Sequence, residues 1–137
     1  MSDLSAALLA LRPPISAELP TIPAATVGDF LHRTLRPVLK LQNELLLLLV
    51  ADFVREHHIP FVVASAAERE RLATELLTRN VKLRYTIIGL ITALFTSPET
   101  SFYRQHRAEL NRRLLELALR RVQDQVTAVA ELVAAPN

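Results

Sequence analysis

The sequence predicts an all-α fold, a compact bundle of about five to six helices with two central apolar helices and a long C-terminal helix. Three observations support this prediction. The chain contains only two glycines, which disfavours the many tight turns of an all-β fold. Apolar residues recur at helical spacing, and capping residues stand where these runs begin. With 137 residues, half of them apolar, the chain has the length of one domain, 1–137.

The N-terminal half is expected to hold a short helix, a connector and a longer, interrupted helix. Ser2 is placed to cap the short helix. Four prolines predict that 12–25 is a proline-rich connector or arm without regular structure. Thr26 is the expected N-cap of a helix over about 27–57, in which Pro37 predicts a break or a kink at the preceding residue.

The helix over 66–79 has the clearest predicted bounds. Ser65 and Glu68 have the spacing of a capping box, in which each side chain accepts a hydrogen bond from the other residue's backbone N–H. Asn80 is expected to end the helix in a left-handed conformation.

Two helices are expected to complete the fold. The first covers about 81–95 and is strongly apolar. The second covers about 99–134, with Ser97 as its expected N-cap. Its inward-facing residues recur at steps of four and three: Leu110, Leu114, Ala118, Val122, Val126, Val129 and Val133.

Two apolar tracts, 45–51 and 87–95, belong to helices that have few polar side chains to expose to water. Such helices must be covered by other helices, by another subunit or by lipid. A membrane span needs about 20 apolar residues. Glu44 and Asp52 bracket the first tract, and the second lies in a window free of formal charge only over 85–98. We therefore expect buried core helices and no transmembrane segment.

The charge pattern does not favour nucleic acid as a partner. The formal net charge is +2, which attracts phosphate only weakly. Glu109–Arg113, Glu116–Arg120 and Arg120–Asp124 have the i, i+4 spacing of stabilising ion pairs, which is typical of a solvated or subunit-facing helix. The final helix carries six arginines in all: Arg104, Arg107, Arg112, Arg113, Arg120 and Arg121.

No residue pattern indicates catalysis, a cofactor or a metal. The chain has no cysteine, which excludes disulfides, thiolate metal sites and cysteine nucleophiles. His57 and His58 lie near Asp52 and Glu56, but adjacent side chains on a helix point about 100° apart and do not easily share one ion. The chain contains no glycine-rich phosphate loop and no G-x-S-x-G motif. We expect a protein that is not an enzyme.

The second apolar helix and the start of the last one contain the candidate residues for a ligand pocket. Gly89 costs a helix about 1 kcal/mol relative to alanine, so either close helix packing or room for a ligand would explain it, and close packing is favoured. The pocket candidates are Tyr85, Gly89, Thr92, Tyr103 and His106.

The leading functional hypothesis is a homodimeric structural or regulatory module that acts through protein contacts with a partner of unknown identity. The alternative is a helical bundle that binds a hydrophobic small molecule between its central helices. A third hypothesis is association with a membrane surface. The N-terminus lacks the basic segment and long apolar run of a secretory signal, so a cytoplasmic location is expected.

Overall fold

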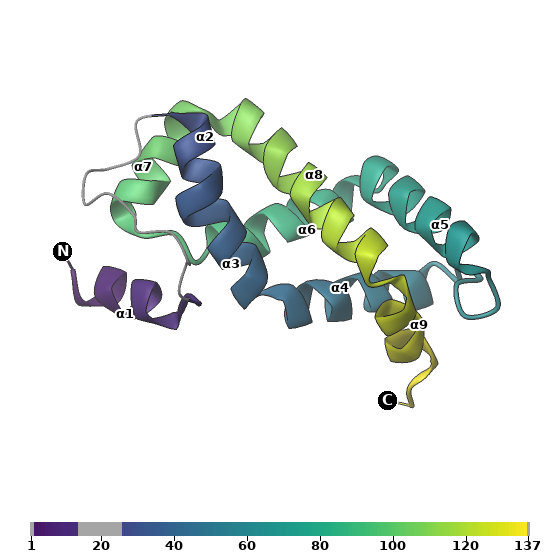
Figure 1. The fold of residues 1–137 in the computed structure, drawn as a ribbon. Coiled ribbons are helices and arrows are strands. Elements are labelled where there is room, and N and C mark those ends of the chain that lie inside the picture. The colour runs from purple at the N-terminus through teal and green to yellow at the C-terminus, as the bar shows by residue number, and fades with distance from the viewer. Residues whose placement is uncertain (1, 14–25, 137) are drawn as a thin grey trace.

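A computed structural model describes residues 2–13 and 26–136 and confirms the all-α class (Figure 1). It contains more helices than the five to six expected. Apart from Arg12 and Pro13, the expected connector lies outside the described residues. The elements are α1 (Asp3–Leu11), α2 (Val27–Phe30), a π-helical turn η1 (Leu31–Leu35), α3 (Arg36–Leu41), α4 (Asn43–Glu56), α5 (Ala66–Arg79), α6 (Val81–Thr92), α7 (Ser97–Gln105), α8 (Arg107–Asp124) and α9 (Val126–Ala134).

One hydrophobic core joins the helices from α2 to α9. α8 crosses the middle of the molecule and packs on α5 and α6, while α4 packs on α9 (Figure 1). Leu110, Leu114, Ala118 and Val122 of α8 are completely buried, as the four-residue spacing predicts. Val133, at the end of the expected stripe, is only partly buried. Among the described residues, no helix combines the length and apolar character needed to cross a membrane.

The long C-terminal helix expected over 99–134 is three helices, which corrects the prediction. His106 and Gln125 leave the helical conformation with φ of −127° and separate α7, α8 and α9. At the second break, the amides of Gln125 and Asn43 exchange two hydrogen bonds, each of 2.8 Å. This pairing attaches the start of α9 to the start of α4, a long-range contact that helical periodicity does not reveal.

Pro37 does not break the helical backbone at Arg36, where a break was one of the two outcomes expected. Proline has no N–H to donate, and its ring crowds the carbonyl four residues earlier. The preceding turn widens into η1, in which the Arg36 N–H donates to the carbonyl of Leu31. The helical backbone then continues to Leu41, and the first interruption is at Gln42.

The predicted caps at Thr26 and Ser65 are confirmed, and one expectation about Asn80 is wrong. Ser65 Oγ accepts a hydrogen bond of 3.2 Å from the N–H of Glu68, at the start of the helix over Ala66–Arg79. Asn80 ends that helix with φ of −82°, in an extended conformation. Its side chain accepts from the N–H of Leu83 at 2.8 Å, because the residue also caps α6.

The complete capping box lies at Thr96, one residue before the expected N-cap at Ser97. Thr96 Oγ1 accepts from the Glu99 N–H at 3.4 Å, and the Glu99 carboxylate accepts from the Thr96 N–H at 2.8 Å. At the site where the box was expected, the Glu68 carboxylate accepts hydrogen bonds from Arg71 instead.

Glu99 is also the centre of the most buried ion pair among the described residues. Both oxygens of its carboxylate accept from Arg12 at 2.6 Å, and the side chains of Arg12 and Glu99 are 7% and 16% exposed. The hydroxyl of Thr34, in η1, donates to the same carboxylate at 2.9 Å. Arg12 also donates to the carbonyl of Leu94. This network joins the end of α1 to η1 and to the loop that leads into α7.

Substitution of Glu99 should therefore destabilise the fold strongly. Glu99→Gln leaves the Arg12 guanidinium buried without its counter-charge, for an expected loss of about 3 kcal/mol in the free energy of unfolding. Urea denaturation measures this loss. Glu75→Gln is the matched control, because it removes a carboxylate from exposed ion pairs and should change stability by less than about 0.5 kcal/mol. Equal losses in the two variants would contradict the structural role of the Arg12–Glu99 pair.

The same network predicts how stability depends on pH. Burial of Glu99 by itself would raise the pKa of its carboxyl, but hydrogen bonds from Arg12, the Thr96 N–H and Thr34, with the charge of Arg12, hold that pKa below its ordinary value of 4.5. A lowered folded-state pKa contributes stability above pH 4.5 that is lost as the pH falls through the folded value. In urea unfolding measured at a series of pH values, the stability of Glu99→Gln should therefore fall less than that of the wild type as the pH is lowered below 4.5.

A left-handed residue ends α4. His58 has φ of 52°, and its N–H and that of Ile59 donate to the carbonyls of Arg55 and Val54 in the pattern of a Schellman motif. A non-glycine residue pays a steric cost in this conformation. His58→Gly should therefore raise the free energy of unfolding by about 0.5–1 kcal/mol in urea denaturation. His57→Gly, at a negative φ of −93°, is the control that should lower it.

Candidate functional site

The structure does not bring the five pocket candidates together into one cavity. Tyr85 and Gly89 are exposed on α6, and Thr92 is partly buried at its C-terminal end. Tyr103, on α7, is buried, and His106 is partly buried at the break before α8. The candidates therefore divide into a pair on the surface of α6, Thr92 at the end of that helix, and a pair near α7.

The inner pair belongs to an aromatic cluster that packs α2, α7 and the segment after α6 together. The Phe95 ring lies 5.4 Å from that of Phe30 and 5.7 Å from that of Tyr103, edge to face in both cases. Phe102 stacks on Phe30 at 5.0 Å and lies 4.5 Å from His106. Tyr103 and His106 are core residues, with side chains committed to packing.

A groove lies between α6 and α8. Its volume is about 300 Å³, and its walls include Val81 and Tyr85 from α6 and Leu115 from α8. Asn111 also lines it and accepts a hydrogen bond of 2.6 Å from the Tyr103 hydroxyl. The remaining lining residues are Arg84, Ile88, Ala108 and Arg112.

Arg84 presents an unsatisfied donor in this groove. Its Nε is buried and has no hydrogen-bond acceptor among the described residues. A buried donor without an acceptor is costly, which makes this atom a position where a bound molecule would supply the missing partner.

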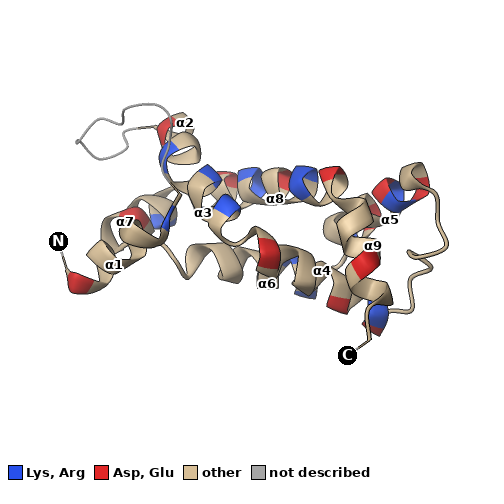
Figure 2. Cartoon of the chain, turned by 60° about the horizontal axis from the view of Figure 1, so that its bottom comes forward, with Lys and Arg blue, Asp and Glu red and all other residues tan. Residues whose placement is uncertain are grey.

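Gly89 lies on the open side of α6, where no helix among the described residues packs closely against it. A Cβ atom built at Gly89 meets no heavy atom of the described residues within 4 Å. The exposed residues beside it, which together form what we term the α6 face, are Val81, Tyr85, Thr86 and Ala93. Lys82, in the first turn, is the one exposed charged residue of α6, whose later turns carry no charge (Figure 2).

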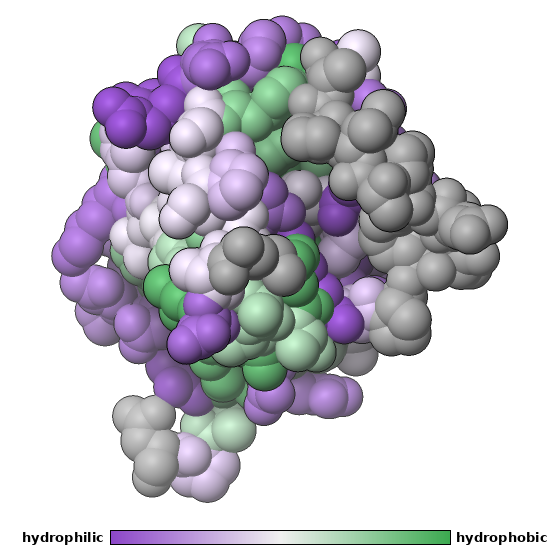
Figure 3. Space-filling model, turned by 90° about the vertical axis from the view of Figure 1, so that its left-hand side faces the viewer, coloured by the Kyte–Doolittle hydropathy of each residue, from purple (hydrophilic) through white to green (hydrophobic). Residues whose placement is uncertain are grey.

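Each apolar tract has a buried side and an exposed side. In α4, Leu46, Val50 and Ala51 are buried, whereas Leu45 and Leu48 are 50% and 42% exposed. The fold thus uses only part of the apolar surface that these two helices carry. Figure 3 faces the end of the molecule where α1 lies, and apolar surface lies among polar residues there too. Large exposed side chains of α1 there are Leu4, Leu9 and Leu11.

The arginines of α8 do not form the ion pairs expected from their spacing. Glu116 is bound by Arg112 at 3.1 Å and not by Arg120. In the part of the chain that the structure describes, neither the Arg113 nor the Arg120 side chain has a hydrogen bond or an ion pair. The expected pairs Glu109–Arg113, Glu116–Arg120 and Arg120–Asp124 are therefore not formed among the described residues.

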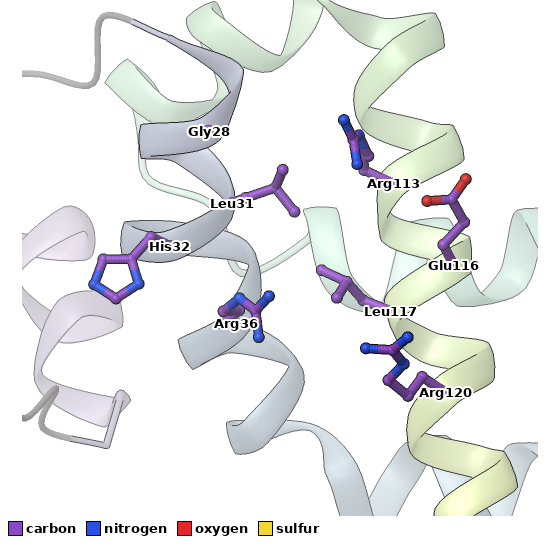
Figure 4. Close-up of a pocket in the computed structure, with 8 residues that line it drawn as sticks. All are labelled: Gly28, Leu31, His32, Arg36, Arg113, Glu116, Leu117 and Arg120. Atoms are coloured by element: carbon purple, nitrogen blue, oxygen red, sulfur yellow. The ribbon is translucent and has the colours of Figure 1, made fainter.

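A second groove, of about 690 Å³, lies between these arginines and α2–α3 (Figure 4). Arg36 of α3 lines it opposite α8, and Leu31 and Leu117 point toward one another across it. We term it the arginine groove; its other lining residues are Gly28, His32, Arg113, Glu116 and Arg120. Sequence analysis did not single out Arg36, because its distance along the chain from α8 hides their proximity.

The described residues contain no group of three or more His, Cys, Asp or Glu side chains placed to hold a metal ion. No protein-family model, curated protein or solved structure matches this chain. The candidate functional surfaces are therefore the α6 face, the groove between α6 and α8, and the arginine groove.

Proposed function

We propose that this protein is a homodimeric structural or regulatory module that acts through protein contacts, with the α6 face as the contact between its two copies. A twofold dimer buries the same surface patch on both subunits. The α6 face can form such a contact if α6 of one subunit crosses α6 of the other. Exposed apolar side chains on a helix whose later turns carry no charge are typical of surfaces that associate.

The observation that carries this proposal is the open position of Gly89. Glycine in the middle of a helix is less favourable than alanine, and no neighbour within the described residues requires its small size. A helix of a second subunit packed against α6 would require glycine at this position, because the absence of a side chain lets two helix backbones approach closely. Tyr85, 68% exposed one turn before Gly89, would contribute apolar area to the same contact.

Substitutions at Gly89 test the dimer. The wild type is expected to be dimeric in sedimentation velocity, and Gly89→Leu to be monomeric, because the added side chain separates the two α6 helices. Thermal unfolding at low protein concentration should show Gly89→Leu to be at least as stable as the wild type, since the added Cβ meets no neighbour among the described residues.

Thr78→Leu, at an exposed position of α5, is the matched control and should remain dimeric. A wild type that stays monomeric over a wide range of concentrations would contradict the proposal. So would a Gly89→Leu variant that dimerises as well as the wild type does.

The alternative function, binding of a hydrophobic small molecule, is favoured by a different observation. The groove between α6 and α8 combines apolar walls with the buried, unpaired Nε of Arg84. A ligand with an apolar body and a single acceptor oxygen would match this combination.

Native mass spectrometry of the purified protein tests this alternative. A copurified lipid-like molecule is expected in the wild type and in Gly89→Leu, and it should be lost in Arg84→Met, which keeps the apolar stem and removes the donor. Absence of a bound molecule from the wild type, together with failure of octanoic acid to bind in calorimetry, would exclude the alternative.

A further inference from the structure

We propose that the arginine groove binds a small organic phosphate, a molecule that carries a phosphate group and an apolar portion. This site is separate from the α6 face and does not depend on self-association. It is formed by side chains from two segments that are far apart in the sequence, α2–α3 and α8 (Figure 4).

The arginine groove has an excess of positive charge that no neighbouring carboxylate neutralises. Arg36, Arg113 and Arg120 line the groove from both sides, and none of their side chains has a hydrogen bond or ion pair with a described residue. Glu116, the one carboxylate that the described residues contribute to the lining, is bound by Arg112. Like charges held across a groove repel one another, and a bound anion removes this cost.

Another groove, which adjoins the arginine groove, extends its positively charged surface. It has a volume of about 360 Å³ and shares Arg36, Leu117 and Arg120 with the first, while adding Arg121 and Asp124. Partial burial of Arg121 and the nearby charge of Arg36 both lower the pKa of the Arg121 guanidinium. The two grooves together hold four arginines against two carboxylates.

The chemistry of these side chains favours phosphate over a carboxylate. A guanidinium presents planar, paired donors that match phosphate oxygens. A phosphate monoester carries a charge of about −1.5 to −2 at pH 7 and three acceptor oxygens, so it can accept from several arginines at once. A carboxylate has one charge and two oxygens, which is too few for three cationic groups.

The floor and size of the groove indicate an organic ligand. Leu31 and Leu117 face each other between the arginines and offer an apolar contact beside the charged one. The volume of about 690 Å³ lies in the usual range for small-molecule sites, about 300–1,000 Å³. A nucleic-acid strand is disfavoured, because the lining contains no Phe, Tyr or Trp on which bases could stack.

Calorimetry of the full chain with octyl phosphate, inorganic phosphate and octanol tests the proposal. Octyl phosphate should bind more tightly than inorganic phosphate, and octanol should not bind. Arg36→Gln and Arg120→Gln should each weaken octyl phosphate binding by about tenfold, as expected for loss of one charge-assisted hydrogen bond. Both side chains are exposed, so the melting temperatures of the two variants should stay close to that of the wild type.

Two further variants complete the experiment. Arg104→Gln, at an exposed position of α7 outside both grooves, removes the same charge and should change octyl phosphate affinity by less than about twofold. Leu117→Ala should weaken binding of octyl phosphate but not of inorganic phosphate, because only the octyl chain contacts the apolar floor.

Three results would overturn the proposal. The first is no binding of octyl phosphate at millimolar concentration. The second is an equal loss of affinity in Arg104→Gln and Arg36→Gln, which would indicate attraction by net charge alone. The third is tighter binding of a short single-stranded RNA than of octyl phosphate, with the same arginines required, which would identify a nucleic-acid surface instead.

Discussion

The buried carboxylate of Glu99 is the constraint on which much of the arrangement depends. An ionised group with so little contact with water must have its charge and its acceptor positions satisfied by the protein. Arg12, Thr34 and the backbone of Thr96 do this together, and they come from α1, η1 and the loop before α7. Thr34 lies in η1, and Leu31 of η1 and Arg36, which follows it, line the arginine groove.

The two proposed surfaces differ in chemistry and in place. The α6 face is nearly uncharged and contains an open glycine, whereas the arginine groove is cationic and lies between α3 and α8. Figure 2 places α3 and α8 along one side of the molecule and α6 along the other. A dimer formed through α6 would therefore leave the groove accessible, and the two functions would be compatible in one protein.

Local sequence signals predicted the helices well wherever the deciding interactions are local. The caps at Thr26 and Ser65 and the helix over Ala66–Arg79 depend on hydrogen bonds across three residues, so they can be recognised from the sequence. The breaks at His106 and Gln125 could not be recognised in this way. At Gln125 the partner is Asn43, which is distant in the sequence, and only packing of α4 against α9 brings the two amides together.

The sequence by itself determined the all-α class, the buried stripe of α8 and the surplus of apolar surface on two helices, since spacing and composition are properties of the chain alone. Only the tertiary structure decided what the polar residues do. Spacing along α8 predicted that its arginines pair with nearby carboxylates, but Glu116 pairs with Arg112, and Arg120 lies opposite Arg36. An arginine side chain reaches several neighbours, and which one it meets depends on how separate helices pack.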